Sequence, residues 1–163
     1  MSVLPLVFWP DARLSAPCEM VGEENFEALV ADMFETMYAA KGRGLAAPQV
    51  GVMRRIFVMD AGWKEGDPTP EAFLDPVITV REKRLETAEE GCLSIPGLMV
   101  PVERPVAVTV AWRDARGDMH MRDFDGFEAR CIQHEIDHLD GRVTLDHLDG
   151  AARAEMLAGY VAP

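Results

Sequence analysis

The sequence is poor in cysteine, with three in 163 residues. A small and odd number of cysteines cannot form a disulfide framework, so we expect a reducing compartment, the cytoplasm. The sequence also has no run of about 20 apolar residues, the length that a membrane-spanning helix requires. The apolar residues near the start, MSVLPLVFWP, follow no basic residue and precede no small-residue cleavage site. We therefore expect neither a signal peptide nor a membrane anchor.

Basic residues are scarce as well: 16 Lys and Arg stand against 28 Asp and Glu, for a formal net charge of −12. A nucleic-acid binder needs a positive face, and so does a polybasic membrane anchor, so we expect neither partner. The rest of the composition is that of a globular protein, 48% hydrophobic and 27% charged. We expect one domain, residues 1–163, able to form a core without disulfides or a structural metal.

Helical periodicity is clearest over residues 23–41. Seven apolar residues there share one face of a helix: Phe26, Leu29, Val30, Met33, Phe34, Met37 and Tyr38. A second helix is expected over residues 126–141 and a short third one over residues 149–160. Residues 81–90, REKRLETAEE, form a charged segment in which we expect no strand, and residues 63–70 have the composition of a loop.

Apolar runs predict strands over residues 55–60, 76–80 and 106–112, and alternation predicts a hairpin partner over residues 118–124. Residues 42–51, GRGLAAPQVG, are rich in small side chains and predict a tight loop. The predicted elements begin with a helix, continue with several strands and end with helices, and they do not alternate as βαβ units. This order predicts an α+β fold, with mainly antiparallel sheets packed around a central helix.

The second predicted helix carries an H-E-x-x-H pattern formed by His134, Glu135 and His138. Histidines four residues apart lie on one face of a helix, one turn apart, and both can bind one metal at about 2.0–2.1 Å. Glu135 lies about 100° further around the helix, where it can take a proton from water at an open metal position. The pattern therefore predicts metal-assisted hydrolysis.

The third metal ligand is left open by this pattern. In zincin peptidases it lies downstream, but His147 is nine residues beyond His138 rather than six, so the longer zincin motif is absent. Cys92, in the segment EGCLS, is the leading candidate. For Cys131 we expect packing and for Cys18 a structural role. For His147 and His120 we expect solvation or local hydrogen bonds.

Three segments together resemble the peptide deformylase family. They are GRGLAAPQ at residues 42–49, EGCLS at 90–94 and QHEIDH at 133–138, and they match the family in sequence, order and spacing. The resemblance extends over most of the chain. It implies the family's α+β fold and the metal-dependent removal of a formyl group from N-formylmethionyl peptides.

The resemblance also implies roles for individual residues. Cys92, His134 and His138 would bind the metal, and Glu135 would be the general base. The metal is usually Fe²⁺ in this family, although thiolate and imidazole ligands also suit Zn²⁺, Ni²⁺ or Co²⁺.

Substrate contacts follow from the same comparison. The Gln49 side chain and the Leu93 backbone N–H would hold the oxyanion, and Gly44 would bind the peptide as an extended strand. We also expect Glu90 and Gly91 to contact the substrate.

The sequence departs from the family at the substrate pocket. Arg43 stands where the family has Val or Ile, and Met99 where it usually has arginine. Phe127 suits an apolar pocket wall, whereas Arg130 either lines the pocket or extends outward. A guanidinium at position 43 would either bind a carboxylate or face the solvent. If it lines the pocket, we expect the preference for the substrate side chain next to the formyl group to be altered.

Two other functions remain compatible with the sequence. One is a zincin-type metallopeptidase with a different third ligand, and the other is a non-catalytic binding module stabilised by metal. The segment from residue 149 onward has Asp149, Arg153 and Glu155 as its only charged side chains. It is not basic, so we do not expect the ribosome docking that a basic C-terminal helix gives to some deformylases.

Overall fold

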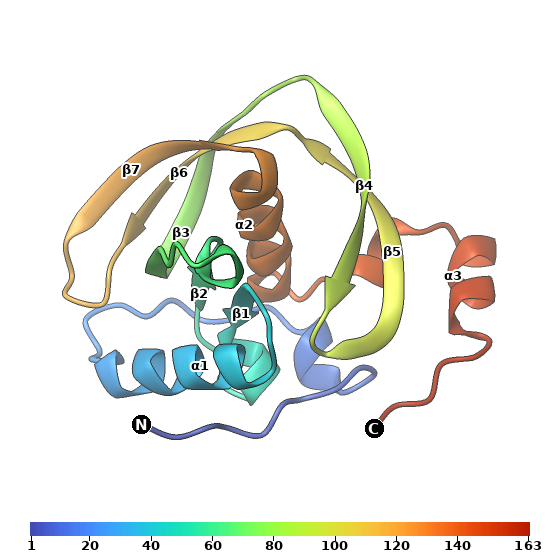
Figure 1. Cartoon of the computed structure of the whole chain (residues 1–163), viewed down its shortest axis with the longest axis horizontal. Coiled ribbons are helices and arrows are strands. Elements are labelled where there is room, and N and C mark those ends of the chain that lie inside the picture. The colour runs from blue at the N-terminus through green and yellow to red at the C-terminus, as the bar shows by residue number, and fades with distance from the viewer.

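Helix α2 (Gly126–Leu139) lies at the centre of the computed structural model, which describes residues 1–163 (Figure 1). Most of its residues are buried, including both histidines of the H-E-x-x-H pattern. A five-stranded sheet lies on one side of the helix and a two-stranded sheet on the other. The helix therefore presents its polar side chains to a protected interior.

The larger sheet is antiparallel throughout, in the order β1-β2-β3-β6-β7. Its strands are β1 (Gly44–Ala46), β2 (Ile56–Asp60), β3 (Pro70–Arg81), β6 (Ala107–Arg113) and β7 (Met119–Asp125). All five residues of β2 are buried. The rings of Phe57 and Phe73 stack across the β2–β3 pair with centroids 4.4 Å apart, and Trp112 adds a third ring 4.6 Å from Phe73. This aromatic group packs in one core cluster with α2 residues such as Ile132.

The smaller sheet pairs β4 (Leu85–Cys92) with β5 (Ile95–Pro105). The register shifts between Glu90 and Cys92, and Cys92 then pairs with Ile95 across a tight turn. A register shift of this kind redirects the side chains that follow it. The turn lies against α2, so it brings the end of β4 close to the helix.

The remaining helices lie around this arrangement. Helix α1 (Glu27–Ala39) contacts β1 and β2, and α3 (Gly150–Leu157) lies near the C-terminus. Four 3₁₀ turns complete the chain: η1 (Ala12–Ser15), η2 (Ala47–Val50), η3 (Trp63–Glu65) and η4 (Thr144–His147). None of the helices has both the length and the apolar character needed to cross a bilayer.

The α+β class with antiparallel sheets around a central helix is confirmed. Several details of the prediction are wrong. The charged segment 81–90 contains most of β4, β5 was not predicted, and the expected loop 42–51 contains β1 and η2. β4 has a single buried residue, Glu90, so it carries none of the apolar alternation by which a strand is recognised.

Candidate active site

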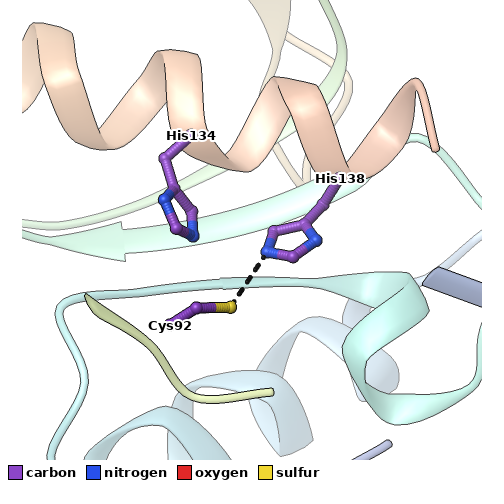
Figure 2. A group of neighbouring side chains, drawn as sticks. All are labelled: Cys92, His134 and His138. Atoms are coloured by element: carbon purple, nitrogen blue, oxygen red, sulfur yellow. Dashed lines mark hydrogen bonds between the residues drawn. The ribbon is translucent and has the colours of Figure 1, made fainter. Parts of the chain in front are cut away.

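One metal-binding group is formed by the three predicted ligands. The donor atoms of Cys92, His134 and His138 all lie within 4.8 Å of one another. Figure 2 shows both imidazoles extending from the same face of α2 toward the thiol at the end of β4. The Cys92 Sγ lies 3.4 Å from the His138 Nε2. The helix sets the spacing of the two nitrogens, and the turn between β4 and β5 supplies the sulfur.

The donor set fits a catalytic divalent ion. One sulfur and two imidazole nitrogens suit iron, zinc, nickel or cobalt. The His134 Nδ1 lies 2.8 Å from the Glu90 Oε1, and this hydrogen bond leaves the Nε2 of His134 for a metal. Only three side chains form the group, and three protein ligands with a free position are typical of catalytic sites, whereas structural sites are closed by four.

The charge state of Cys92 suits a metal ligand. Burial alone would raise the pKa of the thiol, but the charges and hydrogen bonds of His138 and His134 outweigh burial and lower the pKa to about 5. Near neutral pH the sulfur is therefore a thiolate, the form that binds metals.

The carboxylate of Glu90 has both oxygens in use. Arg104 donates to them from Nε (2.6 Å) and from its terminal nitrogen (2.9 Å), and Arg130 donates at 2.8 Å. Burial would raise the pKa of Glu90, but Arg104 and His134 together lower it well below its ordinary value. The carboxylate thus orients His134. Glu90 also lines the cavity, and the substrate contact expected for it stays a prediction.

Glu135 lies beside the metal ligands and has a buried oxygen without a hydrogen-bond partner. This oxygen is Oε2, and the residue as a whole is buried. Burial raises the pKa of this carboxyl. A buried carboxylate with an unpartnered oxygen and a raised pKa has the properties of a general base.

Gly44 lets β1 approach this carboxylate. A Cβ atom at position 44 would lie 2.7 Å from the Glu135 Oε1 and 2.8 Å from the Cys131 Sγ, both closer than real contacts allow. Cys131 is buried at this point and is not among the metal-binding group, in agreement with the predicted packing role.

The amide of Gln49 points toward the same place from η2. The Ala46 N–H donates to its Oε1 (2.9 Å), and its Nε2 donates to the Ser94 Oγ (3.1 Å) and lies 3.6 Å from the Cys92 Sγ. The bond from Ala46 fixes the amide so that the NH₂ group faces the metal ligands. Leu93 lies between Cys92 and Ser94 in the same turn.

A cavity of about 600 Å³ opens beside these groups. Every predicted site residue lines it except His138, which is almost fully buried behind the thiol. The predicted residues that line it are Arg43, Gly44, Gln49, Glu90, Gly91, Cys92, Leu93, Phe127, Arg130, His134 and Glu135. The sequence therefore identified residues that the fold brings into one place.

The two arginines of the pocket take different positions. The Arg43 guanidinium lies over the ring of Phe127, 5.2 Å from its centroid, and forms an ion pair with Glu65. It lines the cavity while its ion-pair partner is largely exposed, so the altered specificity stays a prediction. Arg130 donates to the backbone oxygens of Glu86 and Val102 as well as to Glu90, so it joins α2 to both strands of the small sheet.

Three contributors to the site were not found from the sequence. Arg104 and Asp137 form a buried ion pair at 2.9 Å, and Glu65 is the partner of Arg43. The available signal was weak: a lone arginine in an apolar strand segment, and an aspartate inside the H-E-x-x-H pattern. His147 hydrogen-bonds to Asp137 (2.8 Å), as its expected local role requires.

The hydrogen bond of His147 to Asp137 also argues against a zincin-type metallopeptidase, because His147 is not in the metal-binding group. A zincin takes its third ligand downstream of the second histidine, whereas here the third donor is the upstream Cys92. A purely structural site would need neither the free buried oxygen of Glu135 nor the amide of Gln49.

Comparison with known proteins shows the family to which the chain belongs. A sequence model of the family described as polypeptide deformylase matches residues 3–154. A peptide deformylase of Afipia carboxidovorans is 44% identical over 163 residues, covering 98% of this chain and 95% of the relative. One from Brucella suis is 45% identical over 150 residues, covering 90% and 85%.

Solved structures give the same result. The structure of a peptide deformylase from Ehrlichia chaffeensis in complex with actinonin superposes with a TM-score of 0.90 at 41% identity, covering 97% of this chain and 95% of that one. One from Synechococcus elongatus, also with actinonin, gives 0.90 at 37% identity, covering 97% and 89%. The chain therefore belongs to the polypeptide deformylase family, metal-dependent hydrolases that remove the formyl group.

Proposed function

We propose that Cys92, His134 and His138 hold one divalent ion and that Glu135 is the general base for hydrolysis of an N-formylated peptide. One observation carries the proposal: the three donors converge within 4.8 Å beside a buried carboxylate that has a free oxygen. When bound, a divalent ion supplies a Lewis acid that polarises the formyl carbonyl and lowers the pKa of water.

Glu135 moves the proton in this mechanism. Its Oε2 accepts a proton from the attacking water and returns it to the nitrogen of the leaving amine. Burial raises the pKa of Glu135, which strengthens it as a base and lets it act as an acid in the second half of the reaction. Formate and a free amino terminus are the products.

The negative charge that develops on the formyl oxygen is held by Gln49 and Leu93. The Nε2 of Gln49 is fixed toward the metal ligands by the bond from Ala46, and the backbone N–H of Leu93 follows the cysteine ligand. A prearranged donor of this kind is worth about 3 kcal/mol of the barrier.

The peptide lies along β1 in this proposal. β1 is an edge strand of the larger sheet, so one side of its backbone has no strand partner, and Gly44 and Gly91 line the cavity. An extended peptide can pair with such an edge through its own backbone. The actinonin complexes of the relatives from Ehrlichia chaffeensis and Synechococcus elongatus support ligand binding in this fold.

For the metal we propose Fe²⁺, with Zn²⁺, Ni²⁺ and Co²⁺ as ions that the same thiolate and imidazoles accept. We also propose that residues 1–163 work as a single catalytic domain in the cytoplasm, without direct nucleic-acid contacts. A net charge of −12 opposes stable docking on the ribosome, so the chain should not co-sediment with ribosomes at low salt.

The test is hydrolysis of formyl-Met-Ala-Ser and formyl-Glu-Ala-Ser, with metal content measured on the same sample. Glu135→Gln should lower kcat by roughly 10³-fold and leave metal content unchanged, because the amide cannot accept the proton. Glu103→Gln, the same change at an exposed position of β5, serves as the control. A fully metal-loaded protein that hydrolyses neither peptide would contradict the proposed function.

A further inference from the structure

We infer that the preferred substrate carries a carboxylate on the side chain next to the formyl group, and that Arg43 binds it. The inference rests on the proposed deformylase reaction and names its substrate class. It starts from the wall of the cavity, which Arg43 and Phe127 form together next to the general base.

Arg43 is held close to the reacting groups by its place in the chain. It immediately precedes Gly44, where an added Cβ would lie 2.7 Å from the carboxylate oxygen Oε1 of Glu135. Its charge acts inside the pocket: burial and the carboxylates of Glu135 and Glu90 raise the pKa of Cys131, and Arg43 opposes them. The guanidinium is therefore part of the pocket's electrostatics.

The hydrogen-bonding capacity of Arg43 is not used up. One terminal nitrogen donates to the Glu65 Oε1, while the Nε is buried and has no acceptor. An apolar substrate side chain, such as that of methionine, would leave this donor unpaired, which is costly in a closed pocket. A carboxylate accepts from the guanidinium in the planar two-bond geometry that arginine favours.

The ion pair with Glu65 shows that the Arg43 guanidinium binds a carboxylate. Glu65 is also a partner that a substrate carboxylate can displace. It lies on the three-residue turn η3 (Trp63–Glu65), and its side chain is 60% exposed. Ion pairs of this exposure add little to stability. A substrate carboxylate can therefore take the place of Glu65 by exchanging one anionic acceptor for another.

The surrounding charges favour an anion at this end of the cavity. Lys41 and Lys64 also line it, in a protein whose overall charge is −12. Of the acidic lining residues, Glu90 is paired with two arginines and Glu135 faces the metal ligands, which leaves Glu89 as the remaining negative charge. The ring of Phe127 offers an apolar surface to the methylene groups of the same side chain.

The inference is tested with the metal-loaded protein and three peptides that differ only in the first side chain: formyl-Glu-Ala-Ser, formyl-Gln-Ala-Ser and formyl-Met-Ala-Ser. We expect kcat/KM for the Glu peptide to exceed that for the isosteric Gln peptide by tenfold or more, and to fall as salt is raised. Arg43→Met should remove this preference and improve the Met peptide. Glu65→Gln should lower KM for the Glu peptide several-fold, because the competing carboxylate is gone.

Arg54→Met, which removes remote surface ion pairs with Glu19 and Glu24, should change none of the ratios. Thermal melting checks that each variant folds. If Arg43→Met does not fold, Glu65→Gln provides the second test of the inference. If the wild type hydrolyses the Met peptide at least as well as the Glu peptide, or if Arg43→Met leaves the ratio unchanged, the inference is wrong and the deformylase function stands. If no formyl peptide is hydrolysed with the metal site full, the proposed function fails and the inference with it.

Discussion

A single glycine decides how closely β1 approaches the general base. A side chain at position 44 would collide with the ends of two buried side chains, those of Glu135 and Cys131. Both ends can move without unfolding the backbone, so the collision would displace the carboxylate more than it would destabilise the protein. Gly44 is thus a requirement of the site.

We predict that Gly44→Ala lowers kcat at least tenfold, because a small displacement of the base spoils its alignment with the attacking water. The substitution should lower the free energy of unfolding by about 1–3 kcal/mol, as overpacking does at other positions. Gly150→Ala is the matched control, since a Cβ there meets nothing within 4 Å. Steady-state kinetics and urea unfolding measure both quantities. An unchanged kcat for Gly44→Ala would show that the base tolerates the collision.

The three cysteines differ in their ionisation. The pKa of Cys92 is lowered to about 5 despite its burial, whereas burial raises that of Cys18 to about 11 and that of Cys131 well above its ordinary value. At pH 7 only the first is a thiolate, and the thiolate is the reactive form.

We therefore predict that iodoacetamide at pH 7 alkylates Cys92 first once the metal has been removed by a chelator. Peptide mass spectrometry over a time course identifies the modified residue. The metal-loaded protein should resist labelling at this position, because the ion occupies the sulfur lone pairs. Earlier labelling of Cys131 than of Cys92 would contradict the assignment of the ionised thiol.

The roles of residues that belong to a local sequence pattern could be predicted from the sequence. The roles of residues that depend on a distant partner could not. The H-E-x-x-H spacing fixes the placement of His134 and His138 by helix geometry. Cys92 was the leading candidate for the third ligand once the H-E-x-x-H pattern was recognised, and the family resemblance then assigned it that role, because nothing local separates it from a buried apolar cysteine. Arg104 had only a weak signal, since its function depends on Glu90 and Asp137 from other elements.

At the scale of elements, the small sheet is where the sequence was least informative. β4 leaves five of its eight residues exposed and pairs only with β5, so it is held by backbone hydrogen bonds and by Glu90, which contacts His134 and Arg130 of α2. A strand with this pattern carries no apolar signal. The same strand delivers the cysteine ligand, so the part of the fold that was missed is the part that completes the metal site.

The buried ion pairs of Arg104 join the small sheet to the central helix. Arg104 from β5 contacts Glu90 from β4 and Asp137 from α2, and its side chain is only 5% exposed. Removing Arg104 takes away the cation shared by two largely buried carboxylates, and leaves Glu90 with Arg130 and His134 and Asp137 with His147.

We predict that Arg104→Met lowers the free energy of unfolding by about 3–5 kcal/mol. Urea unfolding followed by circular dichroism measures the change. Arg142→Met is the control: this arginine also faces Asp137, at 3.8 Å, but it is half exposed, so its loss should cost less than about 0.5 kcal/mol. Equal losses for the two variants would mean that the buried network does not hold these elements together.

At the scale of the whole molecule, the site lies where three separate parts of the chain meet. One part is the segment from β1 to η2, another is the turn between β4 and β5, and the third is α2. The order of helices and strands was enough to predict the fold class. The way in which the two sheets enclose the helix depends on pairings between distant segments, which no local pattern encodes.

A metal bound at this meeting point should stabilise the entire fold, because its ligands come from both the small sheet and the central helix. An ion that binds the folded state alone, at a concentration about 1,000 times its Kd, adds about 4 kcal/mol. For a protein of this size that corresponds to a rise in Tm of roughly 10 °C. We predict a fall of this order when a chelator is added to the metal-loaded wild type, measured by differential scanning calorimetry. Cys92→Ala, which lacks one of the three ligands, should melt at nearly the same temperature with and without chelator. If the wild type loses its metal and its Tm does not fall, the ligands do not join the two parts of the fold through the ion.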